Sequence, residues 1–247
     1  MSTESSSPFP PFQAILLDLD GTLLDTIPDL AAASNAMLSE LGAQPLPVTD
    51  IARFVGKGTE VLVRRCLTDK RVGLPADEAG TARALAVFNR HYHVVNGRAS
   101  QPYPGVLEGL QAFHRQGSQL AIVTNKPTEF TLPLLESTGL AEWFDVVVCG
   151  DTCQRKKPDP MPLLHACEQL GCPPARALAI GDSINDALAA RAAGITVLAV
   201  PYGYNEGHDI HSLDIDGIVF GIDAAASWAE RQAPTIGKAK KNAGTPQ

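Results

Sequence analysis

The sequence predicts an α/β protein whose doubly wound parallel sheet carries an all-helical domain inserted after the first strand. Short apolar runs, almost unbroken by polar residues, recur along the chain, as in strands that are buried on both faces of a parallel sheet. Segments with helical spacing separate these runs, and such alternation is typical of doubly wound sheets. The exception is the stretch from about 26 to 100, which has helical patterns but no strand-like run.

Six apolar runs are expected to form the strands of the sheet. Each spans only three to five residues, a length typical of strands rather than helices. The runs cover 14–17, 120–123, 146–149, 177–180, 196–200 and, more weakly, 218–220. The helices between them are expected at 105–116, 128–137, 160–170 and 184–193.

The long interval between the first two strands is expected to form a separate helical cap. Helical patterns cover 30–41, 59–67 and 77–92, and the Gly- and Pro-containing stretch 96–105 is typical of a linker. The 75 residues from 26 to 100 are too many for a simple crossover between strands. The expected domains are an α/β core of 13–25 and 101–232 and a cap of 26–100, with disordered tails of 1–12 and 233–247.

Composition and charge argue against several classes of protein. The 247-residue chain has a formal net charge of −7, which disfavours a general nucleic-acid binder. Its five Cys include no Cys-x-x-Cys pair, so reduced thiols and a cytoplasmic location are expected. The N-terminus lacks the features of a secretory signal, and no run approaches the roughly 20 apolar residues of a membrane helix. We therefore expect no nucleic-acid or membrane partner, whereas the sequence does not distinguish a monomer from a homodimer.

Residues that suit phosphate chemistry follow four of the expected strands. Ligands of open α/β sheets bind at the carboxyl ends of the strands, so these residues are expected to share one site. Carboxylates suit Mg²⁺, and Lys and Thr side chains suit a phosphoryl group. The four segments are Asp18-Leu-Asp20-Gly-Thr22, Thr124-Asn-Lys126, Lys156-Lys157-Pro-Asp-Pro160 and Gly181-Asp182-Ser-Ile-Asn-Asp186.

In this order, the four segments resemble the haloacid dehalogenase superfamily, in particular its phosphatases with a helical cap. The family pattern is Asp-x-Asp-x-Thr, a Ser or Thr, a Lys, and Gly-Asp-x-x-x-Asp, and all four parts occur here. Asp-x-Asp-x-Thr alone is a weak signal, but four parts in order, each close to a strand end, form a strong one. The resemblance implies a Rossmann-like core, Mg²⁺ as cofactor and a small phosphorylated metabolite as substrate.

The resemblance also implies roles for the motif carboxylates. Asp18 would attack phosphorus and form an aspartyl-phosphate, and Asp20 would protonate the leaving alkoxide and then activate water. Asp18, the backbone carbonyl of Asp20, and Asp182 would hold Mg²⁺. The competing structural interpretation is that Asp20 and Asp182 are turn formers, or that Asp182 caps the following helix.

The remaining motif residues would surround the phosphoryl group. Thr124, Lys157 and the backbone of Asn125 would hold its oxygens, and Asp186 would orient Lys157 or a water on the metal. Lys157 is assigned rather than Lys156 because the family pattern places Lys directly before Pro. Asp186 could instead be a charge in the first turn of a helix.

A local excess of positive charge in the expected cap bears on the substrate. Residues 53–71 contain six Lys and Arg against two Asp and Glu in an otherwise acidic chain. Lys57 lies in a Gly-Lys-Gly loop before an expected helix, whose free N–H groups attract anions. We expect Lys57 and Arg53 to recognise a second negative group on the substrate, the alternative being that both are surface charges. Arg64 and Arg65 are expected on a solvated helix face.

Two further motifs resemble phosphoglycolate phosphatases. They are Phe54-Val-Gly-Lys-Gly58 in the cap and Tyr202-Gly-Tyr-Asn205 after the fifth strand. The resemblance implies 2-phosphoglycolate as the substrate, a small ester whose carboxylate would meet the positive charge of the cap. On residue types alone, Tyr204 and Asn205 are better explained as a Gly-rich surface turn than as part of the site.

Other functions remain open at this point. A sugar phosphomutase shares every core residue, and the ester could instead be a sugar phosphate, N-acetylmuramate 6-phosphate, a nucleotide or pyrophosphate. Dehalogenation is disfavoured because it has no leaving alkoxide for Asp20 to protonate. A phosphorelay receiver, phosphorylated after its third strand, would have to use Asp151, and such a domain is about half as long as this chain.

Overall fold

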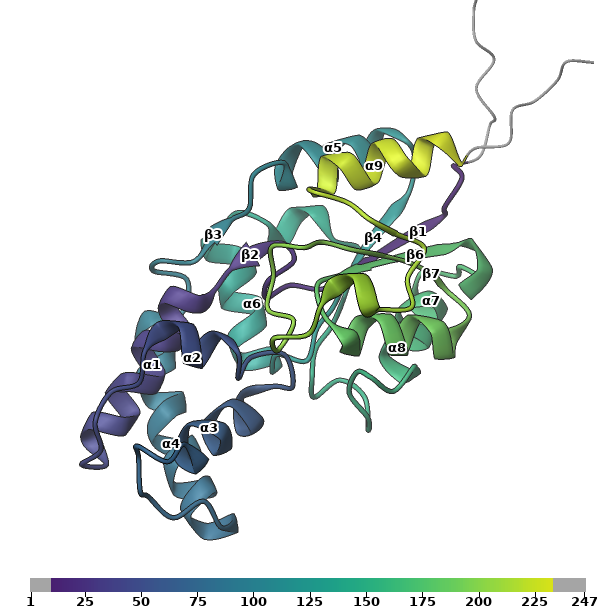
Figure 1. The fold of residues 1–247 in the computed structure, drawn as a ribbon. Coiled ribbons are helices and arrows are strands. Elements are labelled where there is room, and N and C mark those ends of the chain that lie inside the picture. The colour runs from purple at the N-terminus through teal and green to yellow at the C-terminus, as the bar shows by residue number, and fades with distance from the viewer. Residues whose placement is uncertain (1–9, 233–247) are drawn as a thin grey trace, which may run out of the picture.

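A single parallel sheet forms the centre of the computed structural model, which describes residues 10–232 (Figure 1). Its strands lie in the order β5-β4-β1-β6-β7-β8, with bounds β1 (Ala14–Leu17), β4 (Gln119–Val123), β5 (Val146–Val148), β6 (Ala177–Gly181), β7 (Thr196–Ala199) and β8 (Gly217–Ile218). All neighbouring strands are parallel, and the direction of winding reverses between β1 and β6. The structure therefore confirms the predicted doubly wound sheet, and each strand starts and ends within two residues of the prediction.

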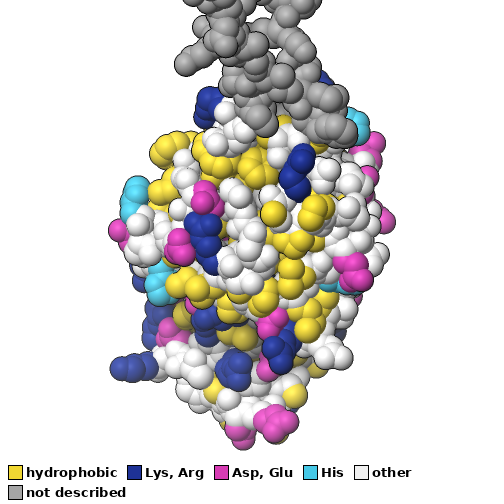
Figure 2. Space-filling view, turned by 90° about the vertical axis from the view of Figure 1, so that its right-hand side faces the viewer, with side chains coloured by type: hydrophobic (Ala, Val, Ile, Leu, Met, Phe, Trp, Pro, Cys, Tyr) yellow, Lys and Arg dark blue, Asp and Glu magenta, His cyan; other side chains and the backbone are white. Residues whose placement is uncertain are grey.

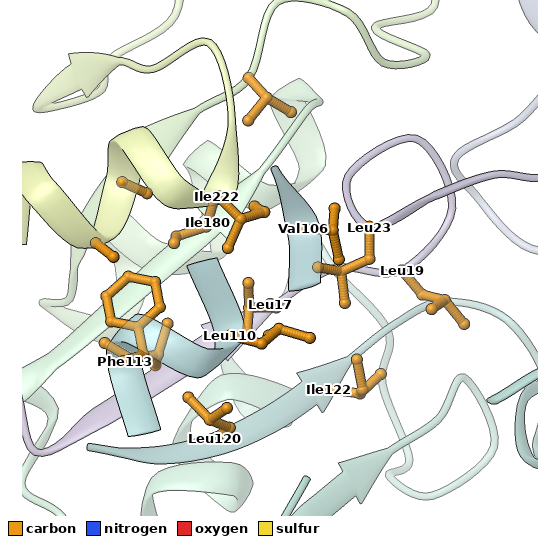
Figure 3. Close-up of a cluster of buried hydrophobic side chains, with 14 of the residues drawn as sticks. Leu17, Leu19, Leu23, Val106, Leu110, Phe113, Leu120, Ile122, Ile180 and Ile222 are labelled. Carbon is orange, nitrogen blue, oxygen red and sulfur yellow. The ribbon is translucent and has the colours of Figure 1, made fainter. Parts of the chain in front are cut away.

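Helices cover both faces of this sheet. They are α5 (Val106–Arg115), α6 (Thr128–Ser137), α7 (Met161–Gln169), α8 (Ile184–Ala193) and α9 (Ile222–Arg231). Ile15 and Leu17 of β1 pack against α5 and α9, whereas Ala14 and Leu16 pack on the other face against α7 and α8. Figure 3 shows the first of these clusters, between the sheet and the helices. The alternation explains the unbroken apolar runs, because both faces of each central strand are buried.

Helices α5 and α9 lie side by side on one face of the sheet (Figure 1). A Cβ atom added to Gly109 of α5 would meet the backbone carbon of Ile222 at 2.3 Å. Glycine at this position therefore sets how closely the two helices approach.

Four helices between β1 and α5 form a cap with a second hydrophobic core. They are α1 (Ile27–Glu40), α2 (Val48–Ala52), α3 (Thr59–Thr68) and α4 (Glu78–Val95). Met37, Val63 and Phe88 are completely buried within this second core. The short helix α2 was not predicted. The helical cap is confirmed. Apart from Phe130 of α6, the buried residues of its hydrophobic cluster all belong to the cap, which supports our proposal that 26–100 is a domain distinct from 13–25 and 101–232.

The two chain segments that connect the cap to the core are joined to each other. Strands β2 (Leu24–Asp25) and β3 (Gln101–Pro102) pair antiparallel, where the sequence predicted only a linker. The buried Asp29 carboxylate accepts hydrogen bonds from the backbone N–H groups of Gly97, Ala99 and Ser100, and from the Ser100 hydroxyl. The start of α1 is thereby tied to the returning segment.

The N-terminal boundary of the core differs from the prediction. Phe12 was assigned to a disordered tail of 1–12, but it is buried and stacks on Trp228 of α9 with 6.2 Å between ring centroids. The Pro10 carbonyl accepts a hydrogen bond from Arg176. The tail prediction was therefore wrong for 10–12, and its remaining parts, 1–9 and 233–247, lie outside the described residues.

The surface carries mixed charge. On the face drawn in Figure 2, the Lys and Arg side chains of the described residues lie among Asp and Glu and do not form one continuous basic patch. All five cysteines belong to the described part of the chain and are unpaired there. None of the helices within 10–232 combines the length and the apolar composition that crossing a bilayer requires.

Candidate active site

Three predicted carboxylates converge where the sheet changes its direction of winding. Asp18 directly follows β1, Asp182 directly follows β6, and Asp186 lies in the first turn of α8. Each residue offers one carboxylate oxygen that lies within 4.8 Å of the other two. Because β1 and β6 are parallel neighbours, their carboxyl ends meet at the same edge and bring these residues together.

Lys157 is the cation of this cluster. Its Nζ lies 3.0 Å from Oδ1 of Asp18 and 2.5 Å from Oδ1 of Asp186, and its side chain is only 3% exposed. Burial lowers the pKa of Lys157, but the Coulombic attraction of Asp18 and Asp186 outweighs it and raises the pKa above its ordinary value. The lysine therefore stays charged beside the predicted nucleophile.

Burial and the crowding of like charges raise the pKa of Asp18 and of Asp182, the two acids at the place where the sheet changes its direction of winding. The pKa of Asp18 rises to about 7, mainly because of burial; Lys157 opposes the rise and Asp186 adds to it. The pKa of Asp182 is raised well above its usual range by burial and by the neighbouring Asp18 and Asp186. One lysine among three carboxylates leaves an excess of negative charge in this cluster.

Asp182 is held from two sides by groups of the core. The Thr22 hydroxyl donates to its Oδ1 at 2.8 Å, and the backbone N–H of Tyr204 donates to its Oδ2 at 2.5 Å. A Cβ atom on Gly203 would lie 2.3 Å from Cβ of Asp182, so glycine is needed for this approach. The prediction that Tyr204 lies in a surface turn outside the site was therefore wrong, although its Gly-Tyr motif marked the segment.

The donor set fits a divalent cation that prefers oxygen ligands. Asp18 and Asp182 contribute carboxylate oxygens whose mutual repulsion a cation would relieve. Asp186 is already occupied by Lys157, by the Ser183 hydroxyl at 2.7 Å and by the Ser183 backbone N–H at 3.1 Å. It is therefore better suited to support Lys157 than to bind a metal directly.

A small cavity adjoins the carboxylates and extends under the cap. It is lined on the core side by Asp18, Asp20, Thr124, Asn125 and Lys126, with a volume of about 30 Å³. The side-chain amide of Asn125 donates to the backbone carbonyl of Lys157 and to that of Gly56 in the cap, each at 3.0 Å. Asn125 therefore connects the phosphoryl site to the cap loop.

Lys126 was given no role by the sequence analysis. Its Nζ lies 3.0 and 3.2 Å from the two carboxylate oxygens of Asp20 and donates to the hydroxyl of Tyr92 at 2.6 Å. Lys126 is 4% exposed and Tyr92, from α4 of the cap, is completely buried. The one available signal was its position directly after Thr124-Asn125 at a strand end.

The basic residues of the cap lie apart from this cavity. Lys57 is exposed and its Nζ lies 3.6 Å from Glu206, while Arg53 is exposed and lines a different surface hollow. Arg65 was expected on a solvated face, but it donates to Glu206 at 2.6 Å and to the Phe54 carbonyl at 3.0 Å. The structure therefore does not bring Lys57 and Arg53 together with Asp18.

Comparison with known proteins identifies relatives over most of the chain. Residues 15–200 match the family described as haloacid dehalogenase-like hydrolase. The chain is 53% identical over 223 residues to the phosphoglycolate phosphatase of Nitrosospira multiformis, covering 90% of this chain and 98% of that protein. It is 48% identical to the phosphoglycolate phosphatase of Thiobacillus denitrificans, covering 87% of this chain and 95% of that protein.

The fold is also shared with a solved structure. The crystal structure of a predicted phosphoglycolate phosphatase from Haemophilus somnus superposes with a TM-score of 0.84 and is 32% identical in sequence. The match covers 88% of this chain and 98% of that one.

Proposed function

The chain belongs to the haloacid dehalogenase-like hydrolase family, and we propose that it hydrolyses 2-phosphoglycolate to glycolate and phosphate. It is a phosphoric monoester hydrolase, and its relatives named phosphoglycolate phosphatase support this substrate. The observation that carries the proposal is the convergence of Asp18, Asp182 and Lys157 at the carboxyl ends of β1 and β6, with Asp20 on the adjoining cavity.

In the proposed first step, a carboxylate oxygen of Asp18 attacks phosphorus while the bond from phosphorus to the ester oxygen breaks. Asp20, in its protonated form, gives its proton to that ester oxygen, so glycolate leaves as an alcohol. Lys157 and the Thr124 hydroxyl, with the backbone of Asn125, hold the phosphoryl oxygens during the transfer. The product of this step is a phosphoryl group bound to Asp18.

In the second step, water attacks phosphorus and its proton passes to Asp20, which restores the acid for the next cycle. The bond between phosphorus and Asp18 breaks, and inorganic phosphate is released. Asp186 keeps the Lys157 ammonium in place through its 2.5 Å contact, and Thr22 keeps the Asp182 carboxylate oriented.

We propose that Mg²⁺ is held by Asp18, Asp182 and the backbone carbonyl of Asp20. Bound there, it would supply positive charge that reduces the repulsion between the Asp18 carboxylate and an anionic phosphate ester. The proposal extends to a cytoplasmic location, which the unpaired cysteines support.

Phosphate release from a panel of esters tests the proposed function. The panel contains 2-phosphoglycolate, sugar phosphates, N-acetylmuramate 6-phosphate, a nucleotide and pyrophosphate, each with Mg²⁺. We expect 2-phosphoglycolate to lead by at least about tenfold in kcat/KM, equivalent to about 1.4 kcal/mol. Asp18→Asn should be inactive, whereas Glu136→Gln, which removes an exposed carboxylate from α6, should keep full activity.

Other outcomes separate the chemistry from the substrate. If another ester leads and Asp18→Asn is inactive, the reaction class stands and the proposed substrate is wrong. If the wild-type protein is as inactive as Asp18→Asn on every ester, sugar-phosphate isomerisation becomes the next assay, because a phosphomutase would use the same core residues.

A further inference from the structure

We infer that Lys126 is the residue that recognises the carboxylate of the substrate. This inference rests on the proposed function, because it concerns how a phosphate ester with a second negative group is selected. The sequence analysis assigned that recognition to Lys57 and Arg53 in the cap, whereas the structure places a different cation in the cavity.

The charge around the cavity favours Lys126 for this role. Of the described residues that line it, Lys126 alone carries positive charge. The cap contributes the apolar side chains of Leu30, Val55 and Leu62. It also contributes Gly58 and Thr59 at the start of α3, where free N–H groups favour an anion. With Lys157 beside Asp18 assigned to the phosphoryl oxygens, a second negative group in the cavity would meet Lys126 and one helix N-terminus.

The position of Lys126 matches the dimensions of the proposed substrate. To receive a proton, the ester oxygen must contact Asp20, whose carboxylate lies 3.0 Å from the Lys126 ammonium. In 2-phosphoglycolate a single methylene separates the ester oxygen from the carboxylate carbon. An ester positioned for cleavage therefore carries its carboxylate within reach of Lys126.

The proposed reaction would also leave Lys126 without its present negative partner, a place that a substrate anion can take. In the structure Asp20 is its negative partner, and Tyr92 accepts a further hydrogen bond from it. In the proposed reaction Asp20 turns to the ester oxygen, and Lys126 then needs another partner, because a buried unpaired cation is strongly destabilising. The substrate carboxylate would take this place, while Tyr92 keeps the ammonium in position from the cap.

Two esters that differ only at this group test the inference. Ethyl phosphate carries a methyl group where 2-phosphoglycolate carries its carboxylate, so the ratio of their kcat/KM values measures recognition of the carboxylate. We expect Lys126→Met to reduce this ratio about 10- to 100-fold, mainly through KM for 2-phosphoglycolate. Lys70→Met, which removes an exposed lysine of the cap, should leave the ratio unchanged.

Each alternative result has a distinct meaning. An equal loss on both esters would make Lys126 only a support for Asp20 and overturn the inference. The inference would also be overturned if the ratio of the two kcat/KM values were unchanged in Lys126→Met, or if it fell only in Lys57→Met. A wild-type protein that does not prefer 2-phosphoglycolate over ethyl phosphate would instead contradict the proposed function.

A second measurement keeps the inference testable if Lys126→Met does not fold. The stable analogues 3-phosphonopropionate and propylphosphonate differ only by the carboxylate, and their affinities can be compared in the wild-type protein and in Tyr92→Phe. We expect 3-phosphonopropionate to bind more tightly to the wild type by at least about tenfold, and Tyr92→Phe to reduce this preference by about three- to tenfold. Equal affinities in the wild type, or an unchanged preference in Tyr92→Phe, would contradict the role of Lys126.

Discussion

Lysine and carboxylate side chains are paired twice at this site, and the two pairs serve different parts of the proposed reaction. Lys157 lies between Asp18 and Asp186, on the side where phosphorus would be attacked. Lys126 pairs with Asp20, on the side where the leaving group would depart. Burial strengthens both pairs, because the lower effective dielectric makes each charge depend on its partner.

The raised pKa values of Asp18 and Asp182 predict how Mg²⁺ should stabilise the protein at different pH values. Without a cation, the pKa of Asp18 is about 7 and that of Asp182 is also raised, so the folded state binds more protons than the unfolded state. The stability of the metal-free protein should therefore fall as the pH rises from about 4 through about 7. At lower pH a cation must displace protons, whereas at higher pH it offsets the repulsion between ionised carboxylates.

We therefore expect Mg²⁺ to raise the Tm more at about pH 8 than at about pH 5.5. Thermal unfolding with and without Mg²⁺ at both pH values measures this difference. Asp182→Asn should largely remove it, and Glu136→Gln should preserve it. An equal increase at both pH values would show that these carboxylates do not hold the cation.

The connection between cap and core depends on elements that are individually very short. Strands β2 and β3 contain two residues each, and such a ribbon is marginal by itself. The Asp29 carboxylate adds hydrogen bonds from Gly97, Ala99 and Ser100, which satisfy backbone groups where the chain leaves α4. We interpret Asp29 as the residue that holds the two connecting segments together.

Asp29→Asn tests this interpretation. An amide keeps one acceptor oxygen but places an NH₂ group against backbone N–H donors, so we expect a loss of about 2–3 kcal/mol in the free energy of unfolding. Urea denaturation measures this loss. Asp77→Asn is the matched control, because Asp77 is an exposed helix cap of α4 that Asn can replace. Similar losses in the two variants would argue against a special role for Asp29.

At the scale of the whole molecule, the loop after β7 connects the core to the cap. The Glu206 side chain is 8% exposed, accepts a hydrogen bond from Arg65 of the cap and lies 3.6 Å from Lys57. It also accepts from Asn185 of the core at 3.3 Å. Burial raises the pKa of Glu206, but Arg65, with smaller contributions from Asn185 and Lys57, outweighs burial and lowers the pKa, so the contact is ionic at neutral pH.

Glu206→Gln is expected to weaken this contact and allow the cap to open more often. We expect KM for 2-phosphoglycolate to rise about 5- to 20-fold, equivalent to about 1–2 kcal/mol, with a smaller change in kcat. Steady-state kinetics measure both constants, with Glu136→Gln as the control for loss of a carboxylate. An unchanged KM would show that this contact does not influence substrate binding.

Much of the fold and of the core site could be predicted from the sequence because these features depend on local patterns. The residues of β1 are buried on both faces, and their unbroken apolar character shows this directly. Asp18 and Asp182 follow strands of a parallel sheet, and parallel strands place their carboxyl ends together whatever the loops between them do. The sequence therefore determined the sheet, the presence of a helical cap and the group of polar residues at the strand ends.

Only the tertiary structure decided the contacts between segments that are distant in the chain. Lys126 meets Tyr92 of the cap across 34 residues, and Tyr204 meets Asp182 through a turn that a Gly-rich motif alone does not specify. Phe12 is buried because Trp228, at the far end of the described chain, packs against it. Such partners are chosen by packing and by the need to pair buried charges, and neither leaves a periodic signal in the sequence around one residue.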